Sequence, residues 1–254
     1  EAEVTLEANP DSVALPMLMR LRRSGFNRIS IGVQSDVDEQ LKAIGRPHNY
    51  KQAQQAVSLA RRAGFDNVSV DLMFGLPNQS REQWMQTLRN IIDLKTEHIS
   101  CYGLKVEPNT PLYDYKDCAN LPDDDAQADM YLYAVETLEH YGLEQYEISN
   151  FAVPGYESKH NLKYWTMGDY MGFGPGAHSY VDGVRYSYVR DLDRYIAAVT
   201  GDKQIIDEYE ICLPVQKAAE TGEPADLMGR IAAALEQGQQ KKLLALCDEA
   251  LKEG

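Results

Sequence analysis

Three polar side chains stand at or near the ends of apolar, strand-like runs in the first part of the chain. Glu7 follows VTL, Gln34 follows ISIGV, and Asp71 lies inside VSVDLMF. In parallel β/α folds the carboxyl ends of the strands meet at one edge and hold the functional residues. These groups could bind the hydroxyl and amino groups of a polar ligand, and Arg46 could add a fork for a carboxylate. Each of the three taken singly could instead cap a helix or bond a neighbouring loop.

The elements that must position these residues alternate along the chain. Strand-like runs occupy 4–7, 28–34, 67–74, 98–106 and 145–152. Helical stretches separate them: one capped by Asp11 or Ser12 and running to Ser24, one over 51–63, one from the cap Ser80 to about Leu94, and one from the run Asp123–Asp125 to Tyr141. This order predicts an α/β fold with a parallel sheet, a β/α barrel or part of one. A doubly wound sheet is the alternative, but no GxGxxG follows the first strand.

The later part of the chain differs in character. Residues 156–190 are rich in Tyr and Gly, with short strand-like pieces around GFGPGAHSYV and VRYSYV, and Asp191–Thr200 is expected to be helical. From about Ala225 the pattern predicts two amphipathic helices divided near Gly238. We therefore expect a partial barrel over 1–152, a small α+β extension over 153–210, and a helical segment over 211–254.

Composition excludes several classes of function. The chain has 254 residues and a formal net charge of −14, which disfavours binding to a nucleic acid backbone. No apolar run is long enough to span a bilayer, and the first residues do not resemble a signal peptide, so we expect a cytoplasmic protein. The four cysteines, Cys101, Cys118, Cys212 and Cys247, have neither disulfide-framework nor CxxC spacing. Most are expected to be buried or incidental thiols.

Six motifs occur in an order that resembles one family. They are LEANP, GVQS with the downstream Gly45-Arg46, DLMFGLP, YGLKVEPNTPLY, HNLKYW and GFGPGAHS. Over about residues 1–210 the sequence is similar to the radical-SAM family of HemW-type haem chaperones and oxygen-independent coproporphyrinogen III oxidases. The resemblance implies a partial TIM-like barrel, lacking its first strands, that binds S-adenosylmethionine (SAM) and a [4Fe–4S] cluster at the strand ends.

The resemblance also assigns the candidate ligand residues. Glu7, Gln34, Arg46 and Asp71 match the positions that contact SAM in the family, and Lys105 lies where the family approaches the ligand. Arg46 suits the methionyl carboxylate, whereas the other three suit ribose hydroxyls or the amino group.

HNLKYW resembles the HNxxYW motif of the haem-chaperone branch. It implies a haem site formed by His160, Asn161, Tyr164 and Trp165, with His160 as the iron ligand. The rings of Tyr164 and Trp165 offer flat surfaces to a porphyrin, and nearby lysines could meet its propionates. In the alternative reading His160 only hydrogen-bonds within an aromatic cluster. His178 is a second candidate ligand, but its glycine-rich setting favours a loop role.

The cysteine triad that the family uses to hold its cluster has no counterpart here. We therefore expect the cluster in a full-length parent only, and no radical chemistry from this fragment. The last thirty or so residues resemble instead the helical cap that precedes cobalamin-binding domains in corrinoid methyltransferase proteins. No DxHxxG motif follows, so no cobalamin binding is expected.

Three functions remain open at this stage. The first is a haem chaperone that hands haem to an acceptor protein. The second is an oxidase that decarboxylates coproporphyrinogen III to protoporphyrinogen IX, and the third is an unrelated β/α-barrel enzyme. HNLKYW favours the first over the second, and the ordered set of motifs disfavours the third.

Overall fold

Four parallel strands, alternating with helices, build most of the first half of the chain. The structure is a computed structural model that describes residues 2–115, 120–201 and 205–211. It divides into two compact units, of which the first ends at Lys159 and the second begins at His160. In chain order the first unit comprises β1 (Thr5–Ala8), α1 (Leu15–Arg23), β2 (Arg28–Gln34), α2 (Asp38–Ala43), α3 (Tyr50–Arg62), β3 (Asn67–Phe74), α4 (Arg81–Ile92), β4 (His98–Gly103), α5 (Pro111–Tyr115), α6 (Asp124–His140), β5 (Glu144–Gln145) and β6 (Asn150–Ala152).

The strands of this unit form one sheet in the order β1-β2-β3-β4-β6-β5. The pairs β1–β2, β2–β3 and β3–β4 are parallel, which confirms the predicted α/β fold with a parallel sheet. The run 145–152 was expected to be one further strand, and this prediction is wrong. The chain turns back on itself, with Tyr146 N donating to Asn150 O at 3.2 Å, so β5 and β6 are two short antiparallel strands. β6 then joins β4 antiparallel.

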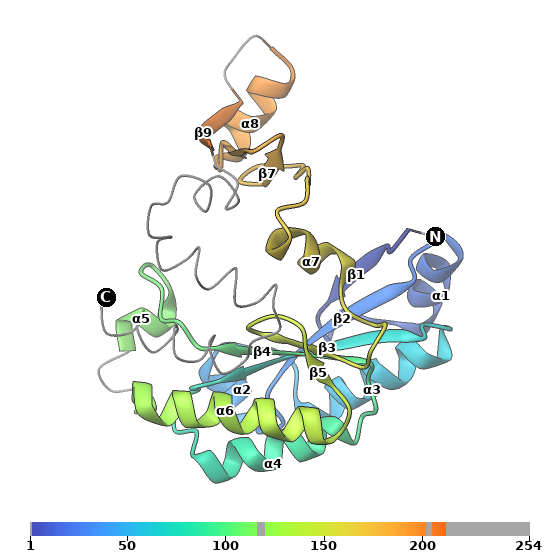
Figure 1. Ribbon diagram of the computed structural model, residues 1–254, viewed down its shortest axis with the longest axis vertical. Helices are drawn as coiled ribbons and strands as arrows, with labels where there is room; N and C mark the ends of the chain where they lie inside the picture. Colours follow the sequence, from blue (N-terminus) through green and yellow to red (C-terminus); the bar gives the residue numbers. More distant parts are fainter. Residues whose placement is uncertain (1, 116–119, 202–204, 212–254) are drawn as a thin grey trace, which may run out of the picture. The chain divides into compact units, whose positions relative to one another are not determined.

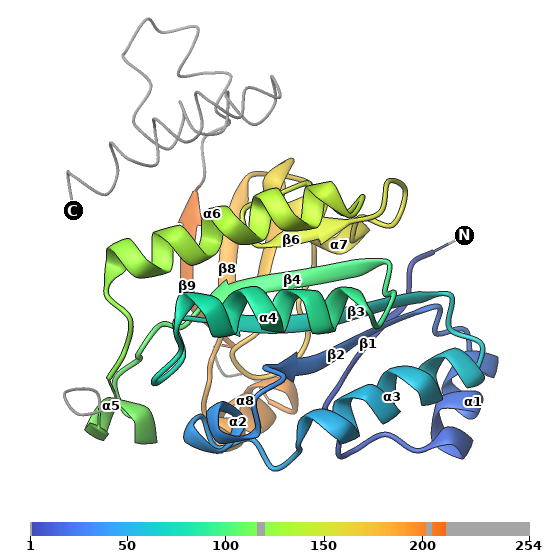
Figure 2. The same cartoon turned by 90° about the horizontal axis from the view of Figure 1, so that it is seen from below.

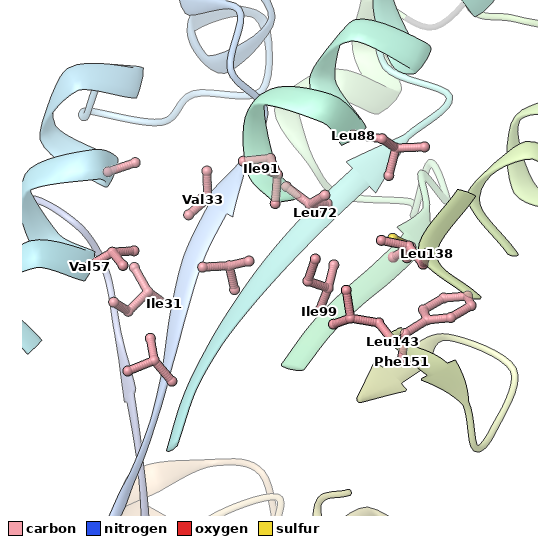
Figure 3. Close-up of a cluster of buried hydrophobic side chains, with 14 of the residues drawn as sticks. Ile31, Val33, Val57, Leu72, Leu88, Ile91, Ile99, Leu138, Leu143 and Phe151 are labelled. Atoms are coloured by element: carbon pink, nitrogen blue, oxygen red, sulfur yellow. The ribbon is translucent and has the colours of Figure 1, made fainter. Parts of the chain in front are cut away.

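The two faces of the sheet have opposite character because side chains alternate along each strand. On one face Ile31, Val33, Leu72, Ile99 and Phe151 are fully or almost fully buried. Helices α3, α4 and α6 lie along this face (Figures 1 and 2). Their apolar side chains, among them Val57, Leu88, Ile91 and Leu138, meet the strand residues in one hydrophobic core (Figure 3).

The opposite face carries polar residues on neighbouring strands. It presents Arg28, Ser30 and Gly32 from β2, Ser69 and Asp71 from β3, and His98 and Ser100 from β4, each paired in register with its neighbour. Five of these side chains, Arg28, Ser30, Ser69, His98 and Ser100, are less than a tenth exposed. Buried polar side chains need partners, and most of those described below find them on the adjacent strand.

Several helix starts follow the predicted capping residues. Ser80 and Asp123 accept a hydrogen bond from the backbone of the first turn of α4 and α6, as expected. The cap predicted at Asp11 or Ser12 is wrong, because α1 begins at Leu15 after Ala14 and has no side-chain cap. Ser12 is engaged instead in the turn after β1, where its hydroxyl donates to Asn9 O at 2.8 Å.

The second unit contains a small antiparallel sheet. Its elements are α7 (Lys159–Trp165), which begins at the boundary, then β7 (His178–Val181), β8 (Val184–Tyr188), α8 (Leu192–Val199) and β9 (Ile206–Ile211). The sheet order is β7-β8-β9. The predicted short strands and the helix after Asp191, which caps α8, are confirmed. The helical pair expected within 211–254 lies outside the described residues.

Over the described parts of the chain, no helix is both long enough and apolar enough to cross a membrane.

Candidate functional site

A polar pocket opens at the edge of the sheet where β1 and β2 end. Its volume is about 390 Å³. Four of its lining side chains are those singled out in the sequence, although they come from three strands and a loop. The lining residues are Glu7, Ala8, Asn9, Ser30, Gly32, Gln34, Arg46 and Asp71. The parallel register explains this convergence, since Glu7 pairs with Ser30 and Gly32 pairs with Asp71.

Gln34 reaches the pocket through an unusual backbone conformation. Its φ is 67°, in the left-handed region that residues other than glycine rarely adopt. The β2–β3 pairing shifts register between Gly32 and Gln34, so the strand end is locally irregular. Such conformations persist where the surroundings enforce them and are frequent at functional sites.

Gly32 leaves room in the pocket wall. A Cβ at this position would lie 3.0 Å from Gln34 Nε2 and 3.7 Å from Asn9 Oδ1. The absence of a side chain therefore keeps open the space between these polar groups. A backbone that comes this close to a cavity suits a ligand that packs against the strand.

Asp71 is the most buried carboxylate of the pocket and lies between serines on both neighbouring strands. Ser30 Oγ donates to Asp71 Oδ1 at 3.0 Å and to Oδ2 at 3.2 Å, and Ser100 is paired with Asp71 in the register of β3 and β4. Burial raises the pKa of Asp71, whereas the hydroxyls of Ser100 and Ser30 oppose the rise. The charge of Glu7 adds to the increase and that of Arg28 counteracts it.

Arg46 completes the charge pattern of the site. Its guanidinium donates from Nη1 to Asn9 Oδ1 at 3.3 Å, which connects it to the loop after β1. The pocket therefore combines two carboxylates, two amides, a hydroxyl and a guanidinium. This set can bind a ligand that carries hydroxyl or ammonium donors and, separately, a carboxylate.

Lys105 does not belong to this pocket. Its side chain is exposed and forms an ion pair with Glu107 at 2.9 Å. Its sequence position after β4 does not bring it among the lining residues. The other four predicted residues of this site do lie together.

Four lining residues were not predicted from the sequence: Ala8, Asn9, Ser30 and Gly32. Ser30 and Gly32 precede Gln34 at a spacing of two, and this alternation would have placed them on the same face of β2. Asn9 stands two residues after Glu7 and could have been found in the same way.

The described residues offer no donor set for an iron–sulfur cluster. Among them, no group of three or more His, Cys, Asp or Glu side chains could hold a metal ion. Cys101 is buried in β4, and burial, together with the charge of Asp71, raises the pKa of its thiol far above the usual range. A thiol in that setting stays protonated and is a poor ligand.

The predicted haem residues all lie on α7, within the second unit. His160, Tyr164 and Trp165 are exposed, and Asn161 is partly buried. His160 Nε2 lies 2.8 Å from Tyr164 Oη, with the rings edge to face at 5.0 Å. Tyr164 also contacts Tyr170 at 4.5 Å between ring centres. An imidazole beside exposed aromatic rings suits a flat, iron-containing ligand.

Comparisons with known proteins agree with this arrangement. The sequence model of the radical SAM superfamily matches residues 1–91. The heme chaperone HemW of Bacillus subtilis is 43% identical over 197 residues, which cover 77% of this chain and 52% of that protein. HemW of Escherichia coli is 46% identical over 181 residues, which cover 71% and 47%.

The remaining comparisons extend beyond bacterial sequences. The mouse protein named radical S-adenosyl methionine domain-containing protein 1, mitochondrial, is 43% identical over 180 residues, covering 70% of this chain and 41% of its own. Among solved structures, coproporphyrinogen III oxidase (HemN) from E. coli, described as a radical SAM enzyme, has a TM-score of 0.71 at 22% identity. That match covers 85% of this chain and 53% of HemN, and it concerns the fold.

The chain spans about half the length of the curated relatives it matches. Within that span, the family match, the identities of 38–46% to HemW sequences and the shared fold agree with one another. Over the matched residues, the chain is similar to the HemW-type radical-SAM proteins.

Proposed function

We propose that this chain is part of a haem chaperone: the first unit binds SAM, and the second binds haem for delivery to an acceptor protein. The observation that carries the SAM site is the pocket at the ends of β1 and β2. It gathers Glu7, Gln34, Arg46 and Asp71, which the sequence alone had matched to the family's SAM contacts.

The pocket's donor set fits SAM. Arg46 offers a planar pair of donors to the methionyl carboxylate, and the carboxylates of Glu7 and Asp71 accept from ribose hydroxyls or from the amino group. Gly32 provides the space that a side chain would fill. Lys105 stays outside this proposal, because its ammonium is exposed and already paired with Glu107.

A resident [4Fe–4S] cluster belongs to the proposal for the longer protein only. When bound to SAM, such a cluster supplies an electron for radical formation, and it requires thiolates as ligands. The described residues do not provide these ligands. No reaction step is therefore assigned to the residues of this chain.

The haem half of the proposal rests on α7. His160 is exposed, and its imidazole can ligate iron while Tyr164 and Trp165 contact the porphyrin plane. Asn161 adds a polar group on the same helix. The relatives of 38–46% identity that carry a functional name are called heme chaperones. The oxidase HemN matches at 22% identity, which bears on the fold rather than on the reaction.

The cellular setting follows from the same proposal. The acceptor is a haem protein, and we place the encounter in the cytoplasm, where a chain without a disulfide framework keeps its thiols reduced.

A haem titration followed by visible absorbance tests this proposal. We expect a Soret shift that saturates near one haem per chain and is lost in His160→Ala. His178→Ala is the matched control, since His178 is also an exposed histidine of the second unit, and its titration should match the wild type. If the wild type gives no shift although circular dichroism shows it folded, the haem site is wrong. If both variants lose the Soret shift equally, the assignment of His160 as the iron ligand is wrong.

A further inference from the structure

The polar face of the sheet carries a charged residue, Arg28, that is not among the residues lining the pocket. Arg28 stands two residues before Ser30 on β2 and is 5% exposed. Its Nε has no hydrogen-bond partner, and no ion pair joins Arg28 to a carboxylate among the described residues. A buried guanidinium without such a partner is costly to the fold, so its position calls for a function.

Strand register shows what surrounds Asp71. On β3, Asp71 pairs with Gly32 of β2 on one side and with Ser100 of β4 on the other. Ser30 Oγ donates to both of its carboxylate oxygens. Ser100 stands opposite Asp71 on the other flanking strand, and its hydroxyl lowers the pKa of Asp71. Hydroxyl groups on both flanking strands restrict the orientation of the carboxylate more than either would alone.

Hydroxyl groups in this position also influence charge. A carboxylate that accepts hydrogen bonds is favoured over the neutral acid, which must donate one. The positive charge of Arg28 acts in the same direction, whereas burial and the charge of Glu7 act against it. Cys101 and Tyr102 on β4 are the other titratable groups near Asp71, and the charge of Asp71 raises the pKa of both.

We propose that Ser30 and Ser100, on the two strands that flank β3, are positioning residues: they hold the Asp71 carboxylate in a fixed orientation, so that it meets the ligand as a hydrogen-bond acceptor. The ligand class is one with hydroxyl or ammonium donors at that point. This inference deepens the proposed SAM site and rests on it for the identity of the ligand. The effect of the two serines on Asp71 can be measured without any ligand.

The first experiment follows the Asp71 carboxyl carbon by ¹³C NMR during a pH titration, with Asp71→Asn used to assign the signal. We expect the pKa of Asp71 to rise in Ser30→Ala, in Ser100→Ala and in Arg28→Met, and to rise furthest in the double serine variant. Ser69→Ala is the matched control. Ser69 lies on the same face of β3 but bonds His98 rather than Asp71, so the pKa of Asp71 should not change.

Conservative replacement separates a positioning role from a structural one. Ser30→Thr keeps the hydroxyl, and because Ser30 lines the pocket the added methyl has room. We expect Ser30→Thr to titrate as the wild type does. An unchanged pKa of Asp71 in folded single variants, or an equal rise in Ser69→Ala, overturns the inference. If the double variant does not fold, the single variants decide.

The second experiment measures SAM affinity against pH by calorimetry. At neutral pH we expect about a tenfold loss of affinity in the double serine variant, on the scale of hydrogen bonds to a charged group. Absence of SAM binding by the wild type, together with the expected NMR shifts, overturns the proposed SAM site but supports the positioning of Asp71. Normal SAM binding with unchanged pH profiles in all variants overturns the positioning and leaves the site intact.

Discussion

Ser69 and His98 face each other across β3 and β4, with the serine hydroxyl 2.7 Å from the imidazole Nδ1. On the other side of the ring, His98 Nε2 lies 2.7 Å from Tyr146 Oη. His98 has no exposed surface, and its pKa is lowered to about 3, first by burial and then by the charge of Arg28. The imidazole is therefore neutral in the folded protein and connects two strands to the turn at Tyr146.

This neutral histidine predicts a loss of stability in acid. The unfolded chain protonates His98 near pH 6.5, but the folded chain does so only near pH 3. The neutral imidazole of His98 contributes its full share to the free energy of unfolding above about pH 6.5. This share is lost as the pH falls through this window, by about 1.4 kcal/mol for each pH unit. In His98→Gln this source of acid sensitivity is removed. Urea unfolding at several pH values should show the gap between wild type and variant narrowing below about pH 6; parallel curves would contradict the prediction.

We expect Asp71→Asn to stabilise the fold at neutral pH and to weaken the binding of SAM. The pKa of Asp71 is raised in the folded state, so its favourable contribution is present at low pH and is lost as the pH rises through the folded pKa. Asparagine stays neutral throughout. We expect the variant to unfold at higher temperature than the wild type at neutral pH, with the difference vanishing in acid, and to bind SAM at least about tenfold more weakly. Scanning calorimetry and binding at two pH values test both parts. A variant that is less stable than the wild type at neutral pH would show that burial is not the main influence on the pKa of Asp71.

Gly32→Ala should impair the pocket without harming the fold. Gly32 is not among the residues with positive φ, so alanine fits its backbone. The added methyl meets Gln34 Nε2 at 3.0 Å and narrows the space beside Asn9. We expect SAM affinity to fall about tenfold while the free energy of unfolding changes by less than about 1 kcal/mol. Calorimetric binding combined with urea unfolding gives both quantities, and unchanged affinity would exclude a ligand at this wall.

We expect Leu72→Ala to destabilise the fold without changing the affinity for SAM. Leu72 follows Asp71 in β3 but points to the other face, where it is fully buried in the core between strands and helices (Figure 3). We expect a loss of about 2–5 kcal/mol in the free energy of unfolding, because a cavity remains. At temperatures where the variant is folded, its SAM affinity should match the wild type. A large loss of affinity there would mean that the core and the pocket are coupled.

Much of the first unit was determined by local pattern. Ser80 and Asp123 cap helices because their side chains can accept from the first turn, and this signal is contained in a few adjacent residues. The apolar runs predicted the parallel strands for a similar reason. Where several signals competed, local reading failed. Ser12 bonds Asn9 instead of capping α1, and the run 145–152 turns back because Tyr146 pairs with Asn150.

For the candidate site too, the sequence determined some features and the tertiary structure determined others. The sequence by itself determined the residue types of Glu7, Gln34, Arg46 and Asp71 and their places at strand ends, since each is encoded within its own motif. Only the tertiary structure decided that these four line one pocket and that Lys105 does not, because that depends on the register of strands far apart in the chain. It also brought Ser30 and Ser100 to the two sides of Asp71. Hydrogen bonds across strands are set by pairing in space, which no local pattern specifies.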